Sequence, residues 1–195
     1  MADHQILIVG GGAAGIATAA SLHKRDASLD IAIIEPSTTH YYQPGWTMVG
    51  AGVFKKEETA RSTASVMPSY VTQIRGTVAS FQPDENSVRL EDGKALTYGS
   101  LVVAAGLKLD WAAIEGLEEA LGRNGVTSNY RYDLAPYTWE LVQKMRGEKA
   151  IFTQPPMPIK CAGAPQKAMY LSCSTWMQAG KIKDIDVSFC NAGPV

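Results

Sequence analysis

The sequence contains few cysteines and no long hydrophobic run, and each absence excludes a class of protein. Three cysteines in 195 residues are too few for a disulfide scaffold. No apolar stretch approaches the roughly 18 residues that a membrane-spanning helix needs. The first five residues lack a basic cluster, so we expect no secretory signal peptide.

An excess of charge of one sign is also absent. The chain carries 18 lysines and arginines against 19 acidic residues, and no basic block runs along it. Nucleic acid is therefore not an expected partner. The three histidines lie far from the cysteines in the sequence, so we expect no metal site. Hydrophobic residues make up 46% of the chain, which is enough for a sizeable core.

Residues 6–35 carry a strand–turn–helix–strand pattern with a G-x-G-x-x-G turn. Its glycines are Gly10, Gly12 and Gly15. In such a turn the first glycine permits a tight bend, the second lets the backbone approach a pyrophosphate, and the third lets the helix pack closely. The N–H groups of Ala13 and Ala14 would then point at phosphate. Glu35 ends the second strand, where a carboxylate can bind both ribose hydroxyls. The pattern predicts a dinucleotide-binding unit.

The segment that follows favours FAD over NAD. A plain NAD domain would continue with further βα units. Here residues 73–98 instead predict three antiparallel strands, over 73–81, 87–90 and 95–98. A buried strand over residues 100–105 then ends at Gly106. This order resembles the FAD domain of the flavoprotein disulfide reductase superfamily, in which that strand ends in Ala-Thr-Gly. Here Ala105 stands where threonine is usual, and Gly99 where aspartate is usual. We include Ala105 and Gly106 among the cofactor-binding residues.

The pattern as a whole predicts an α/β protein. It has a Rossmann-like FAD-binding domain with an antiparallel β insertion, followed by the start of a second Rossmann-like domain. We expect an incomplete FAD-binding domain over residues 1–110, a connecting segment with a helix over 111–148, and a truncated second domain over 149–195. We also expect a helix over 55–66, and a helix over 133–146 with Asp133 as its N-cap.

Cys161 is the candidate for chemistry. It lies beside Lys160 and just upstream of a predicted helix that begins near Pro165, so the helix dipole and the cation both favour the thiolate. A thiolate is the form that attacks sulfur or flavin. The alternative is that Cys161 is buried and inert. The loop of small residues and the flanking lysines favour a reactive cysteine over that alternative. Cys173 and Cys190 are expected to be small core residues. His40 fits either a site residue or a surface histidine.

Three segments together resemble the sulfide:quinone oxidoreductase family, in particular its mitochondrial-like type II branch. They are Ile8–Gly15 with Glu35-Pro36, the loop His40–Gly52, and Lys160–Lys167. The first is shared across the superfamily, and the other two are more specific. No cysteine precedes Cys161, which disfavours disulfide reduction of the glutathione reductase type.

The resemblance implies a set of roles for residues of this chain. Cys161 matches the first of two redox-active cysteines, and FAD is held non-covalently. The implied contacts to FAD are Ala13 and Ala14 on the phosphate turn, Glu35 on ribose, Gln43 and Pro44 near the flavin, and Val78 at the adenine.

The family's reaction defines the partners that the resemblance implies. Sulfide transfers its sulfur to the cysteines, two electrons pass to FAD and then to quinone, and the sulfane sulfur leaves on a small acceptor. The family's second redox cysteine, quinone site and membrane-anchoring segment lie beyond residue 195. We therefore expect an N-terminal half that does not turn over by itself and that is soluble as given. The whole protein would be a peripheral protein of a bacterial or mitochondrial inner membrane, with an oligomer possible.

Two alternatives remain open at the level of the sequence. One is another FAD-dependent oxidoreductase of the superfamily, such as an NADH:quinone oxidoreductase or the flavin subunit of a flavocytochrome-type sulfide dehydrogenase. The Cys161 motif disfavours the NADH enzyme. The other alternative is a non-catalytic fragment.

Overall fold

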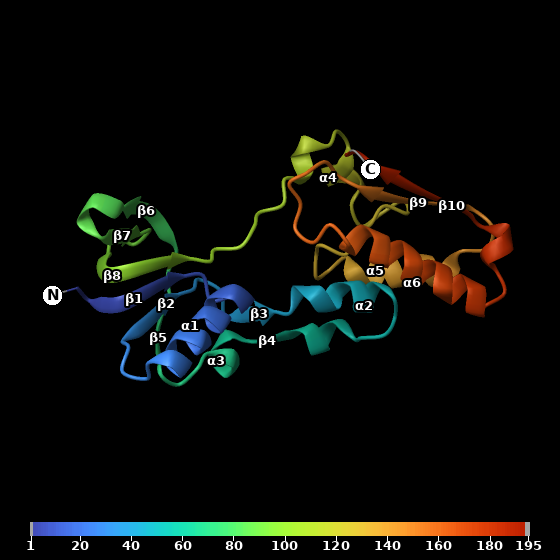
Figure 1. Cartoon of the computed structure of the whole chain (residues 1–195). Coiled ribbons are helices and arrows are strands. Elements are labelled where there is room, and N and C mark those ends of the chain that lie inside the picture. The colour runs from blue at the N-terminus through green and yellow to red at the C-terminus, as the bar shows by residue number, and fades with distance from the viewer. Residues whose placement is uncertain (1, 194–195) are drawn as a thin grey trace. The chain divides into compact units, whose positions relative to one another are not determined.

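The structure, a computed structural model, describes residues 2–193 and divides them into two compact units (Figure 1). The first unit comprises residues 2–41 and 60–108, and the second comprises residues 42–59 and 109–193. The loop over 42–59 therefore packs with the later part of the chain. These units are groups of residues that pack together, and they are not the same as evolutionary domains. The domain boundaries expected from the sequence therefore stay a prediction.

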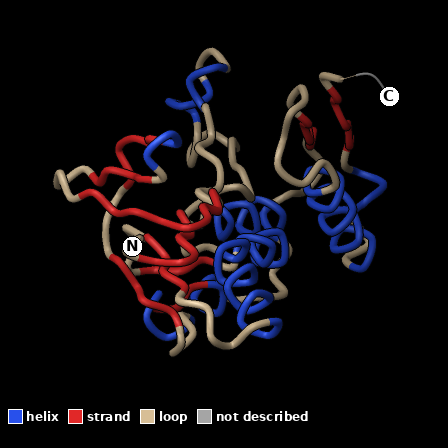
Figure 2. The backbone as a smooth tube through the Cα atoms, turned by 60° about the vertical axis from the view of Figure 1, so that its left-hand side comes forward, coloured by secondary structure: helices blue, strands red, loops and turns tan. Residues whose placement is uncertain are grey.

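One six-stranded sheet organises the first unit, in the order β5-β2-β1-β8-β7-β6. β5, β2, β1 and β8 pair in parallel, and β8, β7 and β6 pair antiparallel. The bounds are β1 (His4–Val9), β2 (Ile31–Ile34), β5 (Val71–Ile74), β6 (Val78–Gln82), β7 (Ser87–Leu90) and β8 (Ala95–Val103). Figure 2 shows these strands gathered in one sheet. The predicted Rossmann-like fold with an antiparallel insertion is confirmed.

The alternation of side chains along β1 supplies both faces of the core. Ile8 faces the helix α1 (Ala13–Arg25) and packs with Ala19. Leu7 and Val9 face the other way, into a cluster that includes residues of β7 and β8. Side chains in a strand point alternately to opposite faces, so a fully apolar strand needs cover on both. Here α1 covers one face, and the antiparallel segment contributes to the cover of the other.

Two strand predictions were wrong in detail. Residues 73–81 do not form one antiparallel strand, because the chain breaks at Arg75, Gly76 and Thr77, so that β5 joins the parallel sheet and β6 begins afresh. The strands expected over 95–98 and 100–105 are one continuous strand, β8, which pairs with β7 and then with β1. Gly99 permits this continuity, because a Cβ there would lie only 2.9 Å from the Gln5 carbonyl oxygen.

The loop after β2 contains more regular structure than its sequence suggested. Its elements are β3 (Thr39–Tyr41), η1 (Gln43–Gly45), α2 (Trp46–Gly50), η2 (Lys56–Thr59), β4 (Ala60–Ser62) and α3 (Thr63–Val66). The single helix expected over 55–66 was wrong. β3 and β4 instead pair as an antiparallel ribbon, and the Ser62 hydroxyl caps the short α3 by accepting from Ser65 N.

The second unit contains a βαβ arrangement and short helices. Its further elements are η4 (Trp111–Ala113), α4 (Leu117–Ala120), α5 (Ala135–Lys144), β9 (Lys149–Gln154), α6 (Ala164–Gln178), η5 (Ile182–Asp184) and β10 (Asp186–Asn191). β9 and β10 are parallel, and α6 connects them. The indole of Trp176 on α6 is buried and donates to the Val142 carbonyl on α5 at 2.9 Å. This bond ties α6 to α5.

Three smaller expectations for the second unit can be compared with the structure. Asp133 is not the N-cap of α5, because Leu134 takes that position and the Asp133 carboxylate binds Arg131 instead. Cys190 is exposed rather than part of the core. Cys173 is half-buried and packs against the cluster around Trp176, as expected of a small apolar residue.

No helix within residues 2–193 has both the length and the apolar character to cross a bilayer.

We predict that Gly15→Ala destabilises the first unit. A Cβ at Gly15 would lie 1.9 Å from the Gly10 carbonyl oxygen, so α1 would have to move away from β1. Overpacking of this kind costs about 2–3 kcal/mol of unfolding free energy, measurable by urea denaturation. The control is Gly12→Ala, whose Cβ would meet open space, and which costs less than about 1 kcal/mol. Equal losses in the two variants would contradict this account of the turn.

Candidate functional site

The turn between β1 and α1 has the geometry of a phosphate cradle. Gly10 has a φ of +105°, and a Cβ there would lie 2.3 Å from the Ala104 carbonyl oxygen. Gly12 is the N-cap of α1, and a Cβ built on it would have no other atom within 4 Å. No side chain caps the helix, and its first turn holds no acidic residue. The N–H groups of Ala13 and Ala14 therefore begin a 13-residue helix whose N-terminus favours an anion.

The carboxylate of Glu35 closes this turn from the side of β2. One oxygen accepts from Gly11 N at 2.8 Å, and the other accepts from Ser37 N at 2.7 Å. The imidazole of His40 also lies beside the glycine turn, because its Nδ1 is 3.4 Å from the Gly11 carbonyl oxygen. The structure thus brings the glycine turn and the predicted ribose-binding acid together, although 23 residues separate Gly12 from Glu35 in the sequence.

The other residues of the first unit that the sequence predicts to bind the cofactor lie at the ends of strands. The Ala104 amide donates to the Val9 carbonyl at 2.7 Å, so Ala105 and Gly106 follow directly beside the end of β1. Val78 begins β6 and pairs with Leu90. A shallow recess lies near Val78, lined by Pro36, Arg75, Gly76, Thr77, Leu90, Glu91 and Asp92. It adjoins Glu35 in the sequence, at the carboxyl ends of β2 and β5, where ligands bind in open α/β sheets.

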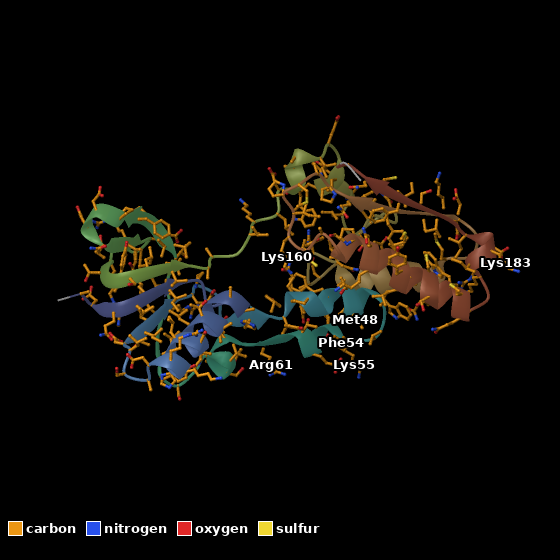
Figure 3. The ribbon with its side chains drawn as sticks, in the orientation of Figure 1. Met48, Phe54, Lys55, Arg61, Lys160 and Lys183 are labelled. Carbon is orange, nitrogen blue, oxygen red and sulfur yellow. The ribbon has the colours of Figure 1, made fainter. Side chains whose placement is uncertain are left out.

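The second unit encloses a separate cavity of about 240 Å³ that contains Cys161. Four segments form its walls: Gln43, Pro44 and Thr47; Thr127, Ser128, Asn129, Tyr130 and Thr138; Ile151, Phe152 and Thr153; and Lys160, Cys161, Ala164, Pro165, Lys167 and Ala168. The wall of the cavity thus includes residues from both of the more specific motifs, the loop around Gln43 and the loop around Cys161. Figure 3 labels Lys160, which immediately precedes the cysteine.

Cys161 lies just before α6 in an unusual backbone conformation. Its φ is +59°, and its carbonyl accepts from the Ala164 amide at 2.8 Å. Pro165 occupies the first turn of α6, as expected. The side chain is exposed, and Lys160 and Lys167 line the same cavity. A thiol in this position has access to solutes and two cations in its vicinity.

The other two cysteines lie elsewhere. Neither Cys173 nor Cys190 lines the cavity. Burial raises the pKa of the Cys173 thiol, which disfavours its thiolate. Among residues 2–193, no three histidine, cysteine or acidic side chains come close enough to hold a metal ion. Cys161 is thus the cysteine that lines the cavity among the described residues.

Tyr130 and Asn129 are among the residues of the cavity wall that sequence reasoning missed. The Tyr130 hydroxyl donates to the Lys160 carbonyl at 2.6 Å. Asn129 contributes a buried Oδ1 that has no hydrogen-bond partner among the described residues. Glycine at position 50 makes room for this amide, because a Cβ there would lie 2.4 Å from Asn129 Oδ1. Both residues lie in a stretch without hydrophobic periodicity, so the pattern alone carried no signal for them.

Comparison with known proteins shows what this arrangement is similar to. A sequence profile of the family described as pyridine nucleotide-disulphide oxidoreductase matches residues 4–140. The mitochondrial sulfide:quinone oxidoreductase of Dictyostelium discoideum is 44% identical over 192 residues, and that of Mus musculus is 42% identical over 189 residues. Each alignment covers 97% of this chain and 42% of the relative. The chain thus spans less than half the length of these relatives.

A solved structure agrees with the fold. The sulfide:quinone oxidoreductase of the hyperthermophilic bacterium Aquifex aeolicus aligns with a TM-score of 0.79 at 24% identity. The alignment covers 96% of this chain and 43% of that one. The sequence matches to the two relatives and to the family profile confirm the resemblance inferred from three sequence segments.

The titration of Tyr130 gives a prediction for alkaline stability. Burial, and then the negative charge of the Cys161 thiolate, raise the pKa of this hydroxyl above that of an ordinary tyrosine. The neutral hydroxyl is thus favoured in the folded state. Its contribution to stability is complete below the ordinary tyrosine pKa of about 10, and is lost as pH rises through the raised value.

The urea midpoint of the chain should therefore fall more steeply above about pH 10 than that of Tyr130→Phe, which has no group to ionise there. The measurement is a series of urea denaturation curves for both proteins between neutral and alkaline pH. Parallel pH profiles of the two proteins would show that Tyr130 makes no such contribution.

Proposed function

Since the chain belongs to the pyridine nucleotide-disulphide oxidoreductase family, we propose that it is the FAD-binding and cysteine-bearing part of an enzyme that oxidises sulfide and reduces a quinone. One observation carries the proposal. The two more specific segments that carry the resemblance to sulfide:quinone oxidoreductases line a single cavity, although Gln43 and Cys161 are far apart in the sequence.

The first unit fits the adenosine diphosphate part of FAD, held without a covalent bond. The open space above Gly12 admits a pyrophosphate close to the backbone, and the uncapped N–H groups of Ala13 and Ala14 can donate to it. Glu35 is fixed beside this turn and has lone pairs left for ribose hydroxyls. The recess near Val78 suits an adenine. When bound, FAD supplies two-electron redox chemistry.

The cavity of the second unit suits the sulfur chemistry. Lys160 and Lys167 attract the hydrosulfide anion, and Cys161 presents an accessible sulfur to it. In the net reaction, the Cys161 thiol, hydrogen sulfide and a quinone give a Cys161 persulfide and a quinol. A sulfur–sulfur bond forms, the sulfide sulfur loses two electrons, and the quinone gains two electrons and two protons. Transfer of the outer sulfur to a small nucleophilic acceptor restores the thiol.

The connection between β9 and α6 favours this function over oxidation of NADH. A Rossmann-like domain that binds a nicotinamide dinucleotide needs backbone N–H groups and glycines immediately after its first strand. Here β9 ends at Gln154 and is followed by Pro155, Pro156 and Pro158, which have no N–H groups to offer. The same connection carries Cys161 instead.

The remaining parts of the proposal concern the whole protein. The relatives from Dictyostelium discoideum and Mus musculus are both named mitochondrial, and these names support the mitochondrial one of the two membranes expected for the whole protein. A quinone dissolves in the lipid, so the enzyme would attach peripherally to that membrane. In this proposal, the second redox-active cysteine and the quinone site lie in the part of the relatives' length that this chain does not span.

We predict that Cys161→Ser abolishes reduction of the flavin by sulfide in the full-length protein. Serine cannot form the persulfide, so the rate of flavin bleaching should fall to less than about one hundredth of the wild-type rate. Stopped-flow absorbance of bound FAD measures it. Cys190→Ser, at an exposed cysteine outside the cavity, should leave the rate unchanged. Bleaching by NADH with no response to sulfide would overturn the proposal.

A second prediction concerns FAD uptake by the first unit. Gly12→Ala places a methyl group in the space proposed for the pyrophosphate and should weaken FAD binding about tenfold or more. Fluorescence quenching of added FAD measures the Kd. The control is Ala20→Ser on the exposed side of α1, which should keep the wild-type Kd. A protein that takes up no FAD in any form would instead favour a non-catalytic fragment.

A further inference from the structure

Cys161 is held in a backbone conformation that its side chain does not favour. Three residues other than glycine have a positive φ within residues 2–193: Asn86, Asn124 and Cys161. Asparagine adopts the left-handed region readily, because its short amide bonds to nearby backbone, but cysteine does not. Such a conformation persists only where surrounding contacts fix it, and it concentrates at functional sites.

Two hydrogen bonds fix the carbonyl groups on either side of the Cys161 α-carbon. The Tyr130 hydroxyl donates to the Lys160 carbonyl at 2.6 Å and lies 3.2 Å from the Cys161 carbonyl oxygen. The Cys161 carbonyl also accepts from the Ala164 amide in the first turn of α6, at 2.8 Å. One contact comes from the helix that follows the cysteine, and the other comes from a side chain 31 residues away.

We propose that Tyr130 is a positioning residue for Cys161. Its hydroxyl holds the two carbonyl groups and so keeps the left-handed backbone that orients the cysteine at the cavity. This inference rests on the proposed function, because the orientation matters for catalysis only if Cys161 reacts with sulfide. Tyr130 itself lines the cavity, and its backbone N–H donates to Ser128 Oγ at 3.1 Å, which anchors the tyrosine.

The hydroxyl group suits this role because it stays protonated. Burial and the negative charge of the Cys161 thiolate raise the pKa of Tyr130. The phenol therefore remains a donor under conditions in which the neighbouring sulfur carries charge. A phenolate would have no proton to donate and would repel both carbonyl oxygens.

The matched pair of variants is Tyr130→Phe and Tyr137→Phe. The first keeps the ring and its packing but loses the donor to Lys160 and Cys161. The second loses a hydroxyl of the same unit that accepts from Gly125 N at 3.1 Å and that does not line the cavity. A difference between the two variants therefore reports on the position of the hydroxyl rather than on the loss of any tyrosine hydrogen bond.

The first measurement is amide hydrogen exchange of the chain, read by mass spectrometry of peptides that cover residues 159–168. In Tyr130→Phe the Ala164 amide should exchange about tenfold faster, because one hydrogen bond changes a local opening equilibrium by about that factor. Peptides that contain Trp176 should be unchanged, which excludes general unfolding. Tyr137→Phe should match the wild type throughout. Equal exchange over 159–168 in all three proteins would overturn the proposal.

The second measurement is turnover of the full-length flavoprotein with sulfide and a soluble quinone. Tyr130→Phe should lower kcat about tenfold and leave the KM for quinone unchanged, because misorientation affects the sulfur step alone. Faster exchange without a loss of kcat would overturn the positioning role. If Cys161→Ser keeps wild-type turnover, the proposed function is wrong. The claim that Tyr130 affects turnover by orienting Cys161 is then wrong as well. The exchange result would then still report whether Tyr130 holds the loop.

Discussion

The first unit depends on the close approach of α1 to the end of β1. The position of a Cβ at Gly15 would fall 1.9 Å from the Gly10 carbonyl oxygen, so only glycine allows the helix to begin there. This approach aims the uncapped N-terminus of α1 at the turn, where Gly12 leaves space. It also brings Gly11 within reach of Glu35. A contact between backbone atoms thus fixes the geometry of the turn that we propose for the pyrophosphate and the ribose.

The sheet extends this constraint to the rest of the unit. β1 is apolar on both faces and cannot remain half-covered, so the protein needs α1 on one side and a second layer on the other. The antiparallel β6, β7 and β8 contribute to that layer, and β8 belongs to both parts of the sheet at once. Gly99 makes this double role possible because it lies against the backbone of Gln5.

The sequence predicted those parts of the molecule that have a period or a motif. The βαβ unit, the position of α6 and the place of Cys161 just before it follow from glycine spacing, apolar runs and Pro165. The irregular stretches were harder, since residues 107–132 have no period from which to infer contacts. Tyr130 reaches the Cys161 loop from that stretch, and only the folded chain brings them together. Asp133 failed as an N-cap because Arg131, two residues earlier, competes for the same carboxylate.

The two units therefore differ in what their sites require of the sequence. The proposed nucleotide site is built mainly from backbone, so it needs glycine at a few positions and tolerates most side chains around them. The cysteine cavity is built from side chains of four separate segments, and Cys161 in its wall has a backbone conformation that needs support from other residues. A sequence motif identifies almost every residue of a site built from backbone. In the cavity the motif identifies Cys161 but not Tyr130, because the tyrosine that holds the Cys161 backbone comes close to it only after folding.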